Sequence, residues 1–182
     1  GTDRSVTLAE LARKAPDPAD LKAMAEFKQD EATYPNGCHI CEVEIDPATG
    51  VTEVVSYSIV DDYGLTVNPI LLGGQVHGGV VQGIGQALYE GAVYDESGQL
   101  LTATFMDYIM PHADHFPEIK FNTRHVPSTT NALGIKGAGE AATIGATPAV
   151  MNAVFDALWR AKGISHIEMP VTPSNMWAVL NS

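Results

Sequence analysis

Alternation of apolar and polar residues predicts a β-hairpin in the first third of the chain. Residues 38–45 alternate, a turn follows at residues 46–50, and residues 51–60 alternate again. This pattern is typical of two half-buried strands joined by a short connection. Another strand is expected over residues 117–126, and residues 100–110 are expected to hold a strand followed by an irregular segment.

Apolar residues at helical spacing, together with capping residues, predict five helical segments. A capping box at residues 7–10 begins a first short helix, and a second short helix is expected over residues 19–27. Longer helical periods run over residues 80–89 and 147–162, and residues 172–180 form a short final helix. Helices and strands are mixed without a regular βαβ rhythm, so the predicted fold class is α+β.

Length and composition are those of an ordinary globular protein. The chain has 182 residues, of which 45% are hydrophobic and 18% charged, enough for a sizeable core. We expect a single domain over residues 1–182, with residues 1–35 as a helical lead-in segment. Because the chain begins at Gly1 rather than Met, we also expect it to be a piece of something longer.

Net charge, the length of apolar runs and the number of cysteines limit the expected partners and location of the protein. The net charge is −12 and there is no basic stripe, so no nucleic acid is expected as a partner. No apolar run reaches the roughly 18–20 residues that a membrane span needs, and no signal segment opens the chain. Two cysteines make no disulfide framework, which favours a reducing, cytoplasmic location.

A glycine-rich loop at residues 134–140 ends on an acid, Glu140. Glycine lets the backbone adopt conformations closed to other residues and lets a ligand come close. A carboxylate at a helix start lies near the positive end of the helix dipole, which favours its ionised form and suits a general base. The alternative is that Glu140 is only a helix-start residue beside a packing turn.

A second glycine-rich stretch, residues 73–79, contains Gln75 and precedes more glycines in a helical pattern. Each helical glycine costs roughly 1 kcal/mol against alanine, so another backbone or a ligand is expected to lie against this helix. Gln75 and Gln82 share a face if both are helical, and their amides suit the edge of a heterocycle. The alternative is two exposed polar residues on an amphipathic helix.

Two further patterns are weaker. Residues 38–41, Cys-His-Ile-Cys, look like half of a zinc site, but no second pair follows and residues three apart on a strand point to opposite faces. Residues 137–142 fit the G-x-G-x-x-A pattern of dinucleotide-binding loops. There, however, Glu140 would place a negative charge where the pyrophosphate belongs. We expect neither a zinc site nor a dinucleotide site.

Several motifs follow one another in a specific order from about residue 36 onward: residues 41–46, 74–79, 82–85, 94–99, 106–108, 134–140 and 152–153. The ordered set resembles the molybdenum-binding subunit of the xanthine dehydrogenase/aldehyde oxidase family. Within this family, the ordered motifs are most similar to the branch that contains the bacterial carbon monoxide dehydrogenase large chain. The resemblance implies the C-terminal half of the cofactor-binding region, with a mixed sheet and packed helices.

The resemblance also implies roles for the two glycine-rich stretches. Glu140 matches the general base beside molybdenum, which takes a proton from a metal-bound hydroxyl as that oxygen attacks an aldehyde or aromatic heterocycle. Gln75 matches the glutamine that hydrogen-bonds the pterin. The small residues around them give the flat cofactor close access: Gly74, Gly78, Gly79, Gly137, Ala138 and Gly139. No residue of this chain is expected to bind the metal directly.

A larger assembly is implied by the same resemblance. The cofactor would be a molybdopterin-type molybdenum cofactor, with iron–sulfur clusters and FAD in partner subunits or domains. The expected partners are the remainder of the molybdenum-binding subunit, iron–sulfur and flavin subunits, and a small organic substrate hydroxylated with oxygen from water. The earlier cofactor loops are missing here, so the chain alone is expected to be inactive. The alternative is a non-catalytic α+β module whose glycine-rich loops hold a small anion or a partner chain.

Overall fold

The computed structural model describes residues 3–28 and 31–182. The chain divides into two compact units, Gly1–Asp30 and Glu31–Ser182. The first unit falls within the predicted lead-in over residues 1–35, whereas the expectation of one domain across the whole chain stays a prediction.

The first unit contains α1 (Leu8–Lys14), which begins as the sequence predicts. The Thr7 hydroxyl accepts a hydrogen bond from the Glu10 backbone N–H at 3.2 Å, and the Glu10 carboxylate accepts one from the Thr7 N–H at 2.8 Å. These reciprocal bonds satisfy two backbone donors that the helix itself leaves unpaired. The predicted capping box is confirmed.

The second helix predicted over residues 19–27 was wrong. A single 3₁₀ turn, η1 (Pro18–Leu21), is present, and residues 22–28 are not helical. No described residue of the first unit is fully buried, so this unit offers no core of its own to the apolar side chains of this stretch. A short helix without such packing is marginal in water.

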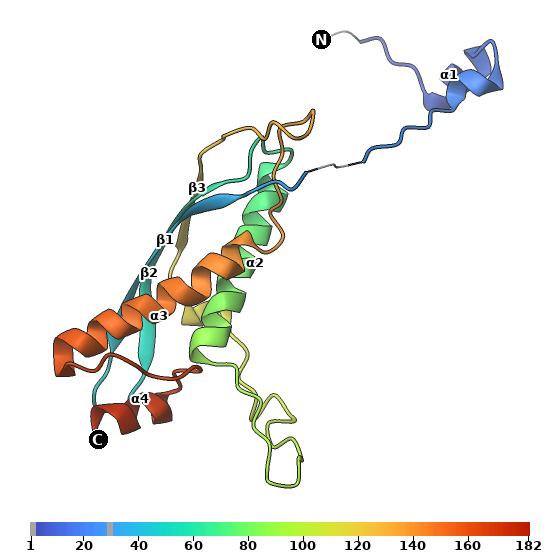
Figure 1. The fold of residues 1–182 in the computed structure, drawn as a ribbon. Coiled ribbons are helices and arrows are strands. Elements are labelled where there is room, and N and C mark those ends of the chain that lie inside the picture. Colours follow the sequence, from blue (N-terminus) through green and yellow to red (C-terminus); the bar gives the residue numbers. More distant parts are fainter. Residues whose placement is uncertain (1–2, 29–30) are drawn as a thin grey trace. The chain divides into compact units, whose positions relative to one another are not determined.

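The second unit is built on a three-stranded mixed sheet of β1 (Asn36–Ile45), β2 (Thr52–Asp62) and β3 (Ile119–Thr123), in that order (Figure 1). β1 and β2 pair antiparallel, and β3 pairs parallel to β2. The predicted hairpin and the predicted strand over residues 117–126 are confirmed. On β1 the side chains alternate between a half-buried and an exposed face, as expected for a sheet covered on one side.

Two long helices, α2 (Pro69–Leu88) and α3 (Ala141–Lys162), cover one face of this sheet (Figure 1). Apolar side chains from β2, α2 and α3 form most of the buried core, and the short helix α4 (Pro173–Leu180) adds Met176 and Leu180 to it. The α+β fold class is therefore confirmed.

Both long helices begin earlier than their sequence patterns predict. α2 begins at Pro69 because the Asn68 side chain caps it, accepting from the N–H groups of Ile70 and Leu71 at 3.0 and 3.1 Å. The glycine-rich stretch is thus helical rather than a loop. α3 begins at Ala141, so that Pro148 lies inside the helix and not in its first turn as predicted.

Residues 100–110 do not form the predicted strand. An isolated bridge joins Tyr94 to Leu100 around the turn at Gly98, and irregular structure continues to η2 (Ala113–His115). This segment projects as a long loop beyond the end of α2 (Figure 1). Its apolar residues, among them Phe105 and Met106, are exposed, so no buried face stabilises a strand there.

The two long helices touch through small residues. A Cβ added at Gly79 would lie 2.8 Å from the Ala142 Cβ, and one at Gly83 would lie 2.6 Å from the Ala146 Cβ. Residues four apart share one face of a helix, so these pairs form a continuous seam. The expectation that another backbone lies against this glycine-rich helix is confirmed, and the backbone is that of α3.

Within the described residues, α3 alone has the length and mean hydropathy of a possible membrane span. Its buried side chains, which include Val150, Val154 and Leu158, belong to the core beneath the sheet. Asp156 and Arg160 form an exposed ion pair on the same helix at 2.8 Å. Packing in the core accounts for these buried apolar residues of α3, while others, such as Ile144 and Trp159, are exposed.

The seam between α2 and α3 predicts opposite outcomes for two glycines on one helix. Gly83→Ala should lower the free energy of unfolding by about 1–3 kcal/mol, because the added methyl group overpacks the seam. Gly73→Ala should raise it by up to about 1 kcal/mol through helix propensity, since no described atom lies within 4 Å of the added group. Urea unfolding of both variants measures the difference, and equal effects would contradict the role assigned to the seam.

Candidate functional site

The loop that carries Glu140 is tied by its backbone to the end of β2. The Leu65 N–H donates to the Gly134 carbonyl at 2.9 Å, and the Lys136 N–H donates to the Tyr63 carbonyl at 2.9 Å. Gly64 has φ +66°, and a Cβ there would lie 2.1 Å from the Gly134 oxygen. Glycine is required at this crossing because any side chain would separate the two segments.

Asn131 closes the same loop from within. Its side-chain NH₂ donates to the Ile135 carbonyl at 2.9 Å, and its side-chain oxygen accepts from the Ile135 N–H at 3.1 Å. Both backbone polar groups of Ile135 are thereby satisfied by one side chain. The loop is consequently fixed rather than held only at its ends.

A buried ion pair provides the strongest link between the loop and the sheet. The Lys136 ammonium group donates to the Asp62 carboxylate, whose other oxygen accepts from the N–H groups of Gly64 and Val126 at 2.8 and 3.0 Å. Burial acts to raise the pKa of Asp62, but the hydrogen bonds from Lys136, Gly64 and Val126 hold that pKa below its usual value. Asp62 therefore remains a carboxylate at neutral pH.

Glu140 itself stands at the N-cap of α3, as the sequence predicts. It is exposed, and within the described residues its side chain makes no capping hydrogen bond. It faces a pocket of about 610 Å³ whose wall also includes Gly137, Gly139, His39 and Asp61. Among the described residues the Glu140 carboxylate has no hydrogen-bond partner, and it is accessible to a ligand in this pocket.

Gln75 reaches the glycine loop from α2. Its side-chain NH₂ donates to the Gly139 carbonyl at 2.7 Å, which joins the two glycine-rich stretches predicted from the sequence. Gln75 lines a second pocket, of about 390 Å³, together with Lys136 and Ala138. Gln75 and Glu140 therefore lie on the borders of different pockets, and the loop runs between the two.

The glycines predicted to contact a ligand fall into two groups. At Gly74, Gly78, Gly137 and Gly139, no atom of the described chain lies within 4 Å of an added Cβ, so their backbones are open to a ligand. Gly79 is instead buried against Ala142 in the seam between the helices, which accounts for that glycine by packing. Ala138, beside the open glycines, packs partly against the core.

Several residues of the site were missed from the sequence, chiefly a buried polar cluster beneath the Glu140 pocket. His39 Nδ1 lies 2.9 Å from the Tyr57 hydroxyl, and His39 Nε2 lies 3.3 Å from Asp61 Oδ1. The Tyr63 hydroxyl donates to Asp61 Oδ2 at 2.7 Å. Burial raises the pKa of both tyrosines, so both hydroxyls keep their protons at neutral pH. The missed signal is two consecutive acids, Asp61 and Asp62, at the end of an alternating strand, because buried acids require partners.

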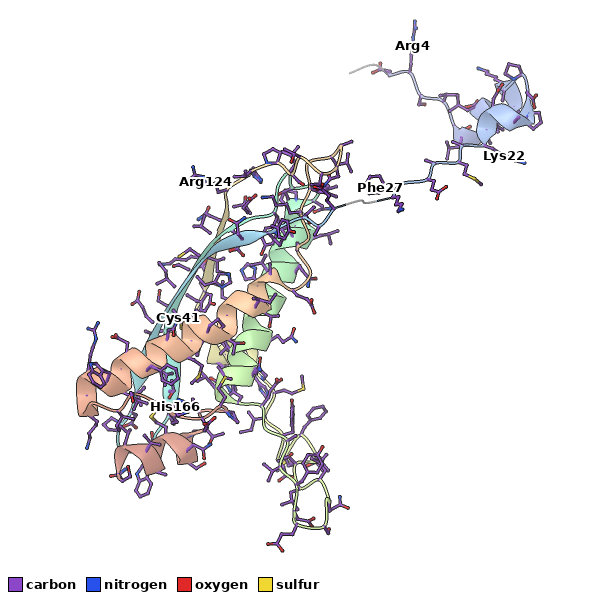
Figure 2. All side chains as sticks on the ribbon, in the orientation of Figure 1. Arg4, Lys22, Phe27, Cys41, Arg124 and His166 are labelled. Carbon is purple, nitrogen blue, oxygen red and sulfur yellow. The ribbon has the colours of Figure 1, made fainter. Side chains whose placement is uncertain are left out.

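The cysteines of β1 point to opposite faces of the sheet, as expected. Cys38 is exposed, while Cys41, labelled in Figure 2, is partly buried and packs against the core. Burial, and secondarily the neighbouring Glu42, raises the pKa of the Cys41 thiol to about 12. A protonated thiol is a poor metal ligand. The described residues also contain no cluster of three or more His, Cys, Asp or Glu able to hold a metal ion.

The arrangement suits a flat, polar organic ligand. Open glycine backbones allow such a ligand to lie close to the chain. The Gln75 side-chain oxygen, which has no protein partner among the described residues, offers an acceptor at the ligand's edge. The Glu140 carboxylate, at the start of α3, borders the neighbouring pocket on the other side of the glycine loop. The residues present therefore fit a pterin-type cofactor.

Several known proteins are similar to this chain in sequence and in fold. A family model described as a molybdopterin cofactor-binding domain matches residues 1–117. The large subunit of nicotine 6-hydroxylase from Paenarthrobacter nicotinovorans is 42% identical over 79% of this chain and 17% of its own length.

Solved structures agree with these sequence matches. Quinoline 2-oxidoreductase from Pseudomonas putida 86 matches with a TM-score of 0.78 and 40% identity, over 81% of this chain and 19% of that one. The copper- and molybdenum-containing carbon monoxide dehydrogenase, in its carbon monoxide reduced state, matches with a TM-score of 0.77 and 37% identity, over 81% and 18%. The chain thus spans about a fifth of the length of these relatives. It belongs to the molybdopterin cofactor-binding domain family.

Proposed function

We propose that the chain is a segment of a molybdenum hydroxylase of the xanthine dehydrogenase/aldehyde oxidase type. Such an enzyme hydroxylates an aldehyde or an aromatic heterocycle with oxygen taken from water. The observation that carries the proposal is the hydrogen bond from Gln75 to the Gly139 carbonyl, which brings the candidate cofactor ligand beside the candidate base. The names of two relatives, which refer to nicotine and quinoline, support an aromatic nitrogen heterocycle as the substrate class.

The cofactor is held in this proposal by backbone and amide groups rather than by metal ligands from the chain. When bound, the molybdenum cofactor supplies a metal centre that activates water and accepts two electrons from the substrate. Gln75 offers its side-chain oxygen to the edge of the pterin, while its NH₂ group stays on Gly139. The open backbones at Gly74, Gly78 and Gly137 let the flat ring system approach.

Glu140 acts as the general base. Its carboxylate stands at the N-terminus of a long helix and faces the pocket without a protein partner among the described residues. A carboxylate in this position accepts the proton of the attacking, water-derived oxygen at one of its own oxygens. The bonds made by Lys136 and Asn131 hold the loop that leads to Glu140.

A complete enzyme requires more than this chain. The remainder of the molybdenum-binding subunit supplies the other cofactor loops, and iron–sulfur clusters and FAD in partner subunits or domains carry the electrons away. The whole assembly works in the cytoplasm. The chain spans about a fifth of its relatives, so on its own it binds little cofactor and turns nothing over.

Replacing the base should slow the chemical step selectively. In the assembled enzyme, Glu140→Gln keeps the size of the side chain but cannot accept a proton, so reduction of the molybdenum centre by substrate should slow about 10²–10⁴-fold. Stopped-flow measurement of the reductive half-reaction, normalised to molybdenum content, gives the rate. Glu118→Gln is the matched control, because Glu118 is exposed and outside the pocket. A Glu140→Gln rate within about threefold of the parent would remove Glu140 from the mechanism.

Gln75→Ala should lower cofactor occupancy more than turnover per bound molybdenum. A side chain that only holds the cofactor contributes binding energy, roughly 1–3 kcal/mol when its hydrogen bonds are buried. Metal and pterin analysis of the purified variant measures occupancy, and Gln99→Ala, at an exposed glutamine outside both pockets, serves as the control. Full occupancy with turnover per molybdenum lowered a hundredfold would place Gln75 in the chemistry instead.

The isolated chain should fold yet carry no cofactor as produced. Its caps, turns and core are complete, whereas it presents only some of the cofactor loops. Circular dichroism and elemental analysis of the same sample test both parts. Stoichiometric molybdenum in a folded sample would show that this segment alone completes the site.

A further inference from the structure

Two consecutive acids at the end of β2 are linked to the segment that carries Glu140, Asp62 directly through Lys136 and Asp61 indirectly through His39. Successive residues on a strand point to opposite faces, so the side chains of Asp61 and Asp62 diverge. Both are buried, at 3% and 5% exposed for the whole residues. Buried carboxylates are retained only with good partners. Asp62 pairs with Lys136, which precedes Glu140 in the sequence, and Asp61 pairs with His39, whose ring packs against Gly145 of α3.

Asp62 holds the loop before Glu140. Its partner is the ammonium group of Lys136, and the two side chains are 7% and 11% exposed, respectively. The backbone N–H groups of Gly64 and Val126 donate hydrogen bonds to the other oxygen of the Asp62 carboxylate. Lys136 precedes Glu140 by four residues, so this ion pair fixes the chain as it approaches the base.

Asp61 holds the helix after Glu140 through the imidazole of His39. Both ring nitrogens of His39 are occupied, Nδ1 by the Tyr57 hydroxyl at 2.9 Å and Nε2 by the Asp61 carboxylate at 3.3 Å. Asp61 is in turn fixed by the Tyr63 hydroxyl at 2.7 Å. The ring cannot rotate without losing one of these bonds.

The fixed ring abuts α3 at Gly145. A Cβ added there would lie 2.8 Å from both Cε1 and Nε2 of His39, closer than carbon atoms normally approach. Gly145 lies five residues after Glu140, within the first two turns of the helix. The distance between the sheet and the start of α3 is therefore set by one imidazole ring lying against a residue without a side chain.

We propose that Asp61 and Asp62 position the Glu140 carboxylate from both sides, Asp62 through Lys136 and Asp61 through the contact of His39 with Gly145. All of these are positioning residues, since each acts on Glu140 through the backbone of the loop or of α3. The inference deepens the proposed function and rests on Glu140 being the base. A displacement of about 1 Å in a catalytic group can cost 10²-fold in rate, so such anchoring matters to turnover.

The test is a double-mutant cycle in the assembled enzyme, read as turnover per molybdenum. Gly145→Ala should lower kcat about 10–100-fold, with KM and molybdenum content near those of the parent, because the methyl group displaces the start of α3. In a His39→Ala background, the same substitution should change kcat less than about threefold, since the colliding ring is gone. An equal loss in both backgrounds would overturn the proposal.

A second variant tests the other anchor and serves if Gly145→Ala does not assemble. Lys136→Met keeps the length of the side chain but removes the ion pair, while Asp62 retains its two backbone donors. Amide hydrogen exchange should rise over residues 134–140 in Lys136→Met and over residues 141–146 in Gly145→Ala. Gly73→Ala, on the other long helix, should change neither region. Parent-like exchange and kcat in Lys136→Met would overturn the proposal.

Glu140→Gln in the same series separates this inference from the function on which it rests. A parent-like rate in Glu140→Gln removes the base and, with it, the inference. A slow Glu140→Gln together with parent-like rates in Gly145→Ala and Lys136→Met leaves the base in place and overturns the positioning role alone.

Discussion

The close approach of α2 and α3 is the constraint on which the rest of the second unit depends. Gly79 and Gly83 allow Ala142 and Ala146 to lie directly against the backbone of α2, and no other residue type leaves this distance available. Gln75 lies one turn before Gly79, and Glu140 lies just before Ala142. The seam between the helices therefore brings these two side chains, which are far apart in the sequence, to the two sides of one glycine-rich loop. Stability and site geometry have the same physical origin here.

Buried charge at the end of β2 provides the complementary constraint. The seam fixes how close the helices lie, but it does not fix the loop that enters α3. Asp62 and Lys136 do so through an ion pair that would be costly to break, since removal of one partner leaves a buried charge uncompensated. Asp61 holds the His39 ring, which packs against Gly145 in the first turns of α3. In this account, the buried groups of the cluster support the backbone on both sides of Glu140 and take no part in proton transfer.

Local sequence patterns predicted the hairpin, the strand near residue 119 and the central parts of both long helices, because alternation and helical period survive in any tertiary context. They missed the starts of those helices. Asn68 followed by Pro69 is a recognisable cap and first-turn pair, but the glycines after it indicated a loop. The pairing of His39 with Asp61 and of Lys136 with Asp62 could not be predicted, because contacts between residues so far apart in the chain leave no local period. The roles predicted for Glu140 and Gln75 came from the order of motifs, and the proximity of their two stretches emerged only from the fold.

The central claim is that this segment places Glu140 beside the molybdenum of a bound cofactor. Crystals of the assembled enzyme, measured on both sides of the molybdenum absorption edge, locate the metal without reference to any assumed role. The account predicts one anomalous peak in the pocket bordered by Gly139 and Glu140, with the Gln75 side-chain oxygen on the edge of the pterin. A molybdenum peak bordered by other segments of the protein, with Glu140 facing solvent, would contradict it.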